Sequence, residues 1–136
     1  MIAAPPRLSM IRLTKRTDFL ATARGIRKVV GALTLELAPT PPETARPQTL
    51  RVGFTASRKI GNAVARNRAK RRMRAAAQER LCLLGRPGHD YVLVARASVL
   101  ACDFQALLGN LSDAVSAAHR KLDDRNAKTD TGKMGA

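Results

Sequence analysis

The sequence predicts a small α/β sandwich in which helices cover a mixed β-sheet, in the order helix, strand, strand, helix, strand, helix. Two observations indicate the strands: apolar and polar residues alternate over residues 33–37 and 49–57, and residues 91–95 form a short apolar run. A third indicates helices, because apolar residues recur at spacings of three and four over residues 65–84 and 104–122. With 136 residues, the chain has room for one domain.

The first predicted helix follows a stretch without periodicity. Thr14 can cap it with its hydroxyl, and Phe19 supplies an apolar contact. Gly25 stands where a helix C-terminus favours a left-handed residue. Residues 1–12 include two adjacent prolines and show no pattern, so we expect a flexible extension there.

Two predicted strands flank a proline-rich loop at residues 39–47. Residues 33–37 have the period of a half-buried strand, and residues 49–57 resume the alternation. We expect the two strands to pair as an antiparallel hairpin with a long loop. On the second strand, one face is apolar and the other is small, polar and basic, so the latter could receive an extended ligand chain. That second face carries Arg51, Gly53, Thr55 and Ser57.

The segment from Arg58 to Arg74 predicts a strongly basic helix. Gly61 breaks the preceding strand, and Asn62 can cap the helix by accepting a hydrogen bond from an early backbone N–H. An apolar stripe can pack against the core, but like charges three and four residues apart weaken an isolated helix by a few tenths of a kcal/mol per pair. A polyanion would relieve that repulsion. The stripe consists of Ala65, Ala69, Met73, Ala76, Ala77, Leu81 and Leu84.

The end of the chain predicts one more strand and one more helix. Residues 91–95 indicate a buried strand, and the strand, basic helix, strand unit would form a parallel crossover, which general rules make right-handed. A core helix should run from a cap at Asp103 to Leu122. Residues 123–136 are polar without an apolar period, so we expect a disordered tail.

The charge of the chain indicates the kind of partner. The formal net charge is +15 and the pI is about 11.5, which favours a polyanion and most directly a nucleic acid. No Asp or Glu lies between Glu43 and Glu79, whereas that interval holds ten of the 25 Lys and Arg residues. Solvated helix faces usually interleave both signs, so a solvated face is the weaker interpretation. Because Phe and Tyr total four, phosphate and shape contacts should dominate over base stacking.

The sequence lacks the residues that several other functions would require. Cys82 and Cys102 are isolated, which favours buried, reduced thiols over a metal site. His89 and His119 stand apart in the sequence, so we interpret both as structural or solvated. A protein-only nuclease would need metal-binding carboxylates or an acid–base pair, and the central region has no carboxylate. No apolar run reaches the ~20 residues of a membrane span, and the first residues lack the apolar core of a signal peptide. A cytoplasmic location is expected.

A known family shares the central motif. The stretch RVGFTASRKIGNAVARNRAKRRMR, residues 51–74, resembles the signature of the protein subunit of bacterial ribonuclease P, whose hallmark is an Arg-Asn-Arg helix after a glycine turn rich in Lys and Arg. LTKRTDF, residues 13–19, is similar to the family's first helix, and DYVLVAR, residues 90–96, to its later strand. The resemblance covers about residues 13–122, which we take as the domain.

The resemblance implies a fold and a division of labour. The family has a left-handed βαβ crossover, against the general rule. Its RNA subunit removes the 5′ leader of precursor tRNA by metal-dependent hydrolysis. The protein helps to bind the precursor and supports the metal sites of the RNA. We therefore expect no cofactor on the protein alone, Mg²⁺ in the RNA–protein holoenzyme, no catalytic residue in this chain, and no membrane or DNA partner.

The resemblance also assigns residues to two surfaces. Phe19 would line the cleft for the single-stranded leader, although a core aromatic is an equal interpretation from the sequence, and Ala23 stands where the family often has a second aromatic. Arg51, Thr55 and Ser57 would complete that cleft. The planar fork of arginine suits phosphate, so the basic helix would dock on the catalytic RNA. The expected RNA-binding residues are Arg58, Lys59, Asn62, Arg66, Asn67, Arg68, Lys70, Arg71, Arg72 and Arg74.

Three other functions fit less well. A ribosomal or RNA-packaging protein would have the same charge. An assay of tRNA processing would distinguish it from a ribonuclease P protein. A double-stranded DNA binder is disfavoured because the sequence has no helix-turn-helix pattern or zinc-finger spacing. Binding to a membrane surface would need a basic amphipathic helix with a more apolar face than this alanine-rich one.

Overall fold

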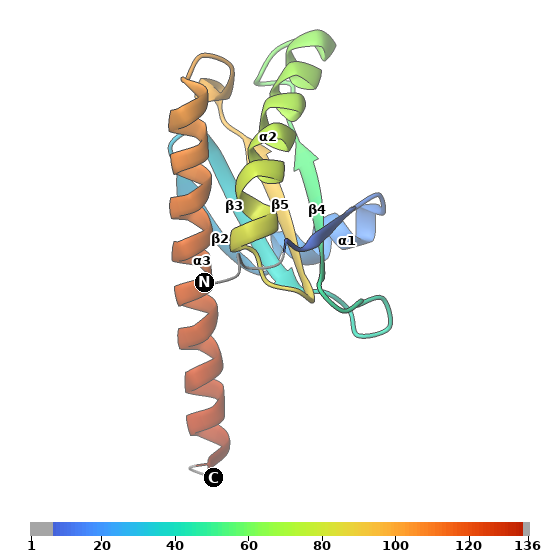
Figure 1. Cartoon of the computed structure of the whole chain (residues 1–136), viewed down its shortest axis with the longest axis vertical. Helices are drawn as coiled ribbons and strands as arrows, with labels where there is room; N and C mark the ends of the chain where they lie inside the picture. Colours follow the sequence, from blue (N-terminus) through green and yellow to red (C-terminus); the bar gives the residue numbers. More distant parts are fainter. Residues whose placement is uncertain (1–6, 135–136) are drawn as a thin grey trace, which may run out of the picture.

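The computed structural model describes residues 7–134, with side chains described up to residue 128. A single five-stranded sheet carries helices on both faces, α2 and α3 on one and α1 on the other (Figure 1). The elements are β1 (Ser9–Arg12), α1 (Arg16–Ala23), β2 (Ile26–Val30), β3 (Leu33–Pro39), β4 (Thr49–Thr55), α2 (Ala63–Leu84), β5 (His89–Ala95), the short 3₁₀ helix η1 (Ala97–Leu100) and α3 (Phe104–Met134). The predicted mixed α/β sandwich is confirmed.

The strand order corrects the predicted hairpin. The sheet runs β1-β4-β5-β3-β2, so β5 lies between β3 and β4 and these two strands do not pair. β5 is antiparallel to β3 and parallel to β4. The apolar run of β5 explains its place, because a strand with neighbours on both edges and helices on both faces can be apolar throughout. The long loop after β3 spans β5 instead of closing a hairpin.

The crossover between β4 and β5 is left-handed, as the family resemblance implied. The two strands are parallel and adjacent. Figure 1 shows α2 in front of the sheet with both strands pointing upward, and the chain passes from β4 to β5 on its left. A right-handed connection would place β5 on the right of β4 in this view. The right-handed expectation from general rules is therefore wrong for this chain.

Two strands were absent from the sequence prediction. β1 occupies an edge of the sheet, parallel to β4, within the part of residues 1–12 that was expected to be flexible. β2 occupies the other edge and pairs with β3 through a turn at Gly31, whose φ is 55°. β1 is short and mostly exposed, and in the five residues of β2 only Ile26 is fully buried, so neither carries the apolar pattern by which a strand is recognised in a sequence. Residues 1–6 lie outside the described residues.

The first helix differs from its prediction at both ends. Its N-cap is Lys15 and not Thr14, and no side chain caps it. Gly25 does not adopt the left-handed conformation expected of it. A Cβ at Gly25 would instead lie 2.2 Å from the carbonyl oxygen of Leu37. Glycine is needed there because α1 approaches the backbone of β3 closely.

β3 is buried on both faces, where the sequence predicted a half-buried strand. The leucines of β3 enter the core shared with α2 and α3. Thr34 and Glu36 on the opposite face are only 3% and 7% exposed. Burial raises the pKa of Glu36, and the positive charge of Arg27 partly opposes that rise. The alternation of residue types was therefore real, but its polar half does not face water.

The last helix is longer than predicted. α3 begins at Phe104, directly after the expected cap Asp103, and continues to Met134 through the segment expected to be disordered. At Asp123 the helix is tied to Arg86 by two hydrogen bonds of 2.7 and 2.9 Å. Figure 1 shows its C-terminal part projecting past the sheet. Residues 123–128 of the helix are exposed, which explains why no apolar period marks them in the sequence.

Two further expectations concern membranes and thiols. Within residues 7–134, none of the helices combines the length and the apolar character that crossing a membrane requires. Both cysteines are free thiols: Cys82 is buried as predicted, whereas Cys102 is only half-buried.

A buried polar contact joins the sheet to α3. The hydroxyl of Tyr91 accepts a hydrogen bond from the Arg86 N–H at 2.8 Å and lies 2.8 Å from Nε2 of His119, to which it can donate. Burial raises the pKa of Tyr91 to about 12. Burial lowers the pKa of His119 to about 4, helped by the positive charges of Arg86 and His89 and opposed by Asp123. His119 is therefore neutral in the folded protein at neutral pH.

We predict that the free energy of unfolding decreases as the pH falls from about 6.5 to about 4. In this window the unfolded chain, with an ordinary histidine pKa of ~6.5, binds a proton that the folded chain does not, so acid favours unfolding. The loss should be at most about 3 kcal/mol. Urea titrations across this window would measure it. His119→Gln should flatten the pH dependence, whereas His89→Gln keeps the buried His119 and removes only a minor contribution to its pKa, so it should retain most of the pH dependence. A variant at position 119 with an unchanged pH slope would contradict this assignment.

Candidate RNA interface

The basic helix α2 starts at a well-defined turn. Gly61 has a φ of 147°, a conformation in which side chains are strained. The side-chain oxygen of Asn62 accepts a hydrogen bond from the N–H of Ala65 at 2.9 Å, which confirms the predicted cap. In the preceding turn, the hydroxyl of Ser57 accepts a hydrogen bond from the N–H of Lys59 at 3.3 Å. The turn and the cap thus set where the run of cations begins.

The apolar stripe of α2 packs against the core as predicted, except at its two ends: Ala65 is half-buried and Leu84 is exposed. Ala69, Met73, Ala76, Ala77 and Leu81 are fully buried. Leu84 was expected in the stripe but is 42% exposed, because it lies in the last turn of the helix. The buried residues fix the rotation of α2 and turn its opposite side to solvent. There Asn67, Arg68 and Arg71 are exposed, as are Arg58 and Lys59 in the turn before the helix.

Two arginines of the predicted RNA-binding set contact the protein itself. Nη2 of Arg72 donates to the carbonyl oxygen of Cys102, which ties α2 to the segment between η1 and α3. The guanidinium of Arg74 lies 5.9 Å from the centre of the Phe54 ring. Both side chains are half-buried, as are Arg66 and Lys70. The predicted set therefore divides into exposed cations and cations held partly against the fold.

A hollow borders the exposed side of α2. It has a volume of about 540 Å³ and lies between α2 and the edge strand β1. Its cations come from both elements, and one of them, Arg12, was not among the predicted residues. Because residues 1–12 were expected to be flexible, Arg12 was not predicted to lie beside α2. The lining residues are Arg12, Val64, Asn67, Lys70, Arg71 and Arg74.

The opposite face of the sheet carries Phe19. A Cβ at Gly53 would lie 2.4 Å from Cε1 of Phe19, so the ring rests directly on the backbone of β4. The ring is nevertheless only half-buried. Thr55, the next residue of β4 on the same face, is half-buried, and Ser57 beyond it is exposed. Phe19 thus packs on the sheet and still presents part of its ring to solvent.

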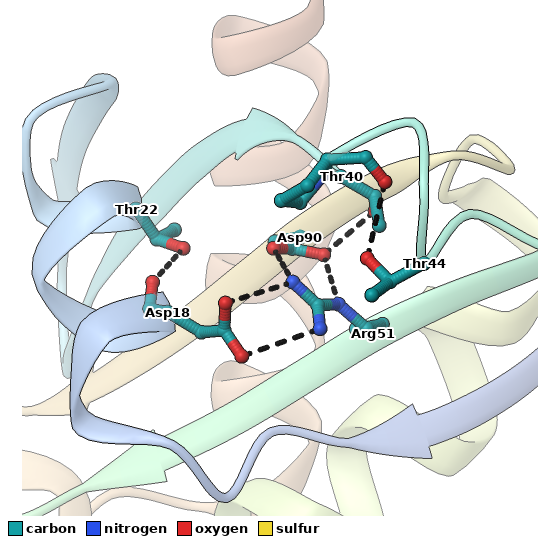
Figure 2. Close-up of polar contacts among 7 residues, drawn as sticks. Asp18, Thr22, Thr40, Thr44, Arg51 and Asp90 are labelled. Carbon is teal, nitrogen blue, oxygen red and sulfur yellow. Dashed lines mark hydrogen bonds and ion pairs between the residues drawn. The ribbon is translucent and has the colours of Figure 1, made fainter.

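Arg51 lies on the predicted face of β4 but is held by two carboxylates (Figure 2). Its Nε and Nη2 donate to the two oxygens of Asp90 at 2.8 and 2.6 Å, and its Nη1 donates to Asp18 at 3.3 Å. Thr40 donates to the same Asp90 at 2.7 Å. The hydrogen bonds with Asp90 raise the pKa of Arg51, although burial opposes the rise. The Arg51 side chain thereby joins α1 to β4 and β5.

The polar groups of the described residues show the chemistry open to this surface. Nδ1 of His89 lies 2.9 Å from the carbonyl oxygen of Pro87, and His119 contacts Tyr91, so each histidine has a partner in the fold. Within the residues that the structure describes, no three His, Cys, Asp or Glu side chains lie together as a metal site. What the surface offers is a set of exposed guanidinium, ammonium and amide groups, which suits the binding of phosphates.

Comparison of sequences identifies the family. The sequence model of the Ribonuclease P family matches residues 9–119, most of the chain. This chain belongs to the ribonuclease P protein family.

Two relatives show how far the similarity extends. The chain is 40% identical over 136 residues to a ribonuclease P protein component of Caulobacter vibrioides, covering 100% of this chain and 89% of the relative. It is 44% identical over 119 residues to that of Ruegeria pomeroyi, covering 87% of this chain and 92% of the relative. The similarity therefore includes α1, the whole sheet and α2.

Solved structures confirm the fold of a ribonuclease P protein. The RNase P protein of Staphylococcus aureus superposes with a TM-score of 0.64 at 22% identity, covering 79% of this chain and 94% of that one. The protein of Thermotoga maritima gives a TM-score of 0.62 at 23% identity, covering 76% and 94%. The fold is thus retained at low sequence identity.

In this ribonuclease P protein, we predict that the two carboxylates around Arg51 contribute unequally to stability. Asp90 makes the shorter bonds and its side chain is 4% exposed, compared with 18% for Asp18. Asp90→Ala should lower the free energy of unfolding by about 3–5 kcal/mol, because it leaves a partly buried cation without its main partner. Asp18→Ala should cost about 1 kcal/mol or less. Urea denaturation of both variants measures the difference, and equal losses would refute this ranking.

Proposed function

We propose that this chain, as the protein component of ribonuclease P, docks on the catalytic RNA through the solvent-facing side of α2 and the turn before it. Family membership makes the chain a subunit of the ribonucleoprotein endoribonuclease that removes the 5′ leader of precursor tRNA. The single observation that supports the docking surface is its charge. Arg58, Lys59, Arg68 and Arg71 are all exposed there, and no acid occurs between residues 43 and 79 to neutralise them.

The RNA-facing residues would act by neutralising backbone phosphates. Arg66, Arg68, Lys70 and Arg71 provide fixed positive charge along α2, and Asn67 adds an amide between two arginines. Arg72 is assigned a different part, because its guanidinium is bonded to the carbonyl of Cys102. It holds the segment before α3 against α2 and so helps to fix the position of α2. Arg58, Lys59 and Arg74 complete the basic surface, and Asn62 contributes by capping the helix.

We assign the precursor leader to the opposite face of the sheet. The half-buried ring of Phe19 offers a stacking surface for one base, and Thr55 and Ser57 offer hydroxyls along β4. Arg51 belongs to this face, but its donors are occupied by Asp18 and Asp90. Its part is therefore to hold α1, which carries Phe19, against β4. Ala23 is exposed and too small to stack, so Phe19 alone would carry the aromatic contact from α1.

The chemistry is assigned to the RNA subunit, which performs the hydrolysis in this family. We place the required Mg²⁺ with the RNA and its substrate, and the protein contributes cations that reduce the repulsion between two polyanions. The holoenzyme would act in the cytoplasm on newly made precursor tRNA. The protein alone should therefore be inactive as a nuclease.

Cleavage of a 5′-extended precursor tRNA at low magnesium tests this function. Three reactions are compared: the protein alone, a bacterial ribonuclease P RNA alone, and the two combined. We expect efficient cleavage only in the combination. Cleavage by the protein alone would mean that it contains its own catalytic site. No effect of the protein on the RNA would favour the alternative of a structural RNA-packaging protein.

We predict that the double variant Arg66→Ala/Arg68→Ala binds the catalytic RNA more weakly and with less salt dependence. Loss of two phosphate contacts should reduce the slope of log affinity against log salt by about 1.4–1.8. Fluorescence anisotropy at several salt concentrations measures the slope. Arg46→Ala/Arg120→Ala removes two exposed cations outside α2 and is the matched control. If a folded α2 variant keeps the slope of the wild type, the docking surface is elsewhere.

A further inference from the structure

Two adjoining hollows between β1 and α2 share a pair of arginines. The larger one, of about 540 Å³, is the cationic hollow described above. The smaller one, of about 180 Å³, is lined by Met10, Arg12, Val52, Phe54, Arg74 and Gln78. Arg12 from the edge strand and Arg74 from the helix line both. The two hollows thus meet at these guanidinium groups, and they differ in character.

The larger hollow suits an anion. Four of its six lining residues are cations, namely Arg12, Lys70, Arg71 and Arg74. The Nε atoms of Arg66, Arg72 and Arg74 are buried and have no hydrogen-bond partner among the residues that the structure describes, and of these three arginines only Arg74 lines the hollow. A buried donor without an acceptor is uncommon in folded proteins and costs free energy. A phosphate oxygen at this place would satisfy it.

The smaller hollow suits a flat, partly apolar ring. Met10, Val52 and Phe54 supply apolar walls, and the guanidinium of Arg74 lies over the Phe54 ring. Unpaired RNA bases stack on arginine planes as well as on aromatic rings. Val52 and Phe54 are only 4% and 8% exposed, so the stacking surface in this hollow is the guanidinium plane of Arg74. The amide of Gln78 offers both a donor and an acceptor to the edge of a base. At about 180 Å³ the hollow is smaller than the ~300–1,000 Å³ typical of drug-sized ligands.

We propose that this paired hollow binds one unstacked nucleotide of the catalytic RNA. Arg12, Lys70, Arg71 and Arg74 hold its phosphate. The base enters the slot between Met10, Val52 and Phe54, with Gln78 at its edge. This inference deepens the proposed function and rests on it, because it names the contact that α2 and β1 make together with the RNA.

The sheet lies between this paired hollow and the surface assigned to the precursor leader. This position indicates which RNA the paired hollow would bind. Side chains alternate along a strand, so Val52 and Phe54 of β4 point toward α2, whereas Arg51 and Gly53 point toward α1. The slot therefore opens on the side of the Arg-Asn-Arg segment and away from Phe19. The catalytic RNA, and not the precursor leader, is the polyanion assigned to that side.

Binding of the catalytic RNA by Arg12→Ala and Gln78→Glu tests the proposal. Arg12 and Gln78 are exposed and outside the core, so both variants should fold, which thermal unfolding verifies. Arg12→Ala should lower the salt slope by about 0.7–0.9, as expected for one phosphate contact. Gln78→Glu places a carboxylate beside Arg74 and should weaken binding by about 10-fold. Gln105→Glu makes the same substitution on an exposed position of α3 and should bind like the wild type.

Chemical probing of unpaired bases in the bound RNA provides the second measurement. We expect one base that the wild-type protein and Gln105→Glu protect, and that becomes reactive when Gln78→Glu is bound at saturating concentration. If Arg12→Ala and Gln78→Glu both keep the affinity of the wild type and the same base protection, the proposal is overturned and the proposed function stays intact. Variants that lose binding to a leader oligonucleotide but keep wild-type binding to the catalytic RNA would also overturn it. A wild-type protein that neither binds the RNA nor supports cleavage would refute the proposed function itself.

Discussion

The register of β4 is the constraint on which the two surfaces of this protein depend. Leu50, Val52 and Phe54 enter the core under α2, and the residues between them face α1. A slip by one residue would turn Arg51 into the core and the apolar residues toward α1. The ion pairs of Arg51 with Asp90 and Asp18, and the contact of Phe19 with Gly53, both oppose that slip. One strand thereby keeps the basic side and the Phe19 side of the molecule apart.

The concentration of positive charge on α2 is tolerated because the rest of the fold holds the helix. Its cations repel one another, which weakens the helix by itself. The Asn62 cap, the buried stripe around Met73 and the bond from Arg72 to the segment before α3 compensate for that repulsion. The domain therefore presents a charged surface whose remaining repulsion an outside anion would relieve, which agrees with the proposed docking on RNA.

Particular residues show how far the sequence predicts this structure. The cap at Asn62, the stripe of α2 and the two faces of β4 were predicted because each depends on neighbours within one element. The predicted hairpin of β3 with β4 was wrong, because pairing depends on a competing strand, β5, that begins only at His89, after the whole of α2. Arg12 was missed because β1 has no apolar pattern of its own. Arg51 was predicted on the correct face, but the carboxylates that hold it come from α1 and β5.

The sequence by itself determined the charge of this protein, the periodicity of its helices and the family motif from residue 51 to 74, because these are properties of composition and local spacing. The tertiary structure alone decided the strand order, the burial of the polar face of β3, the partners of Arg51 and Arg72, and the meeting of β1 with α2. Those features arise where segments distant in the chain compete for the same neighbour. The local spacing of residues does not show which segments pair, because strand pairing depends on burial and hydrogen bonding summed over the whole fold.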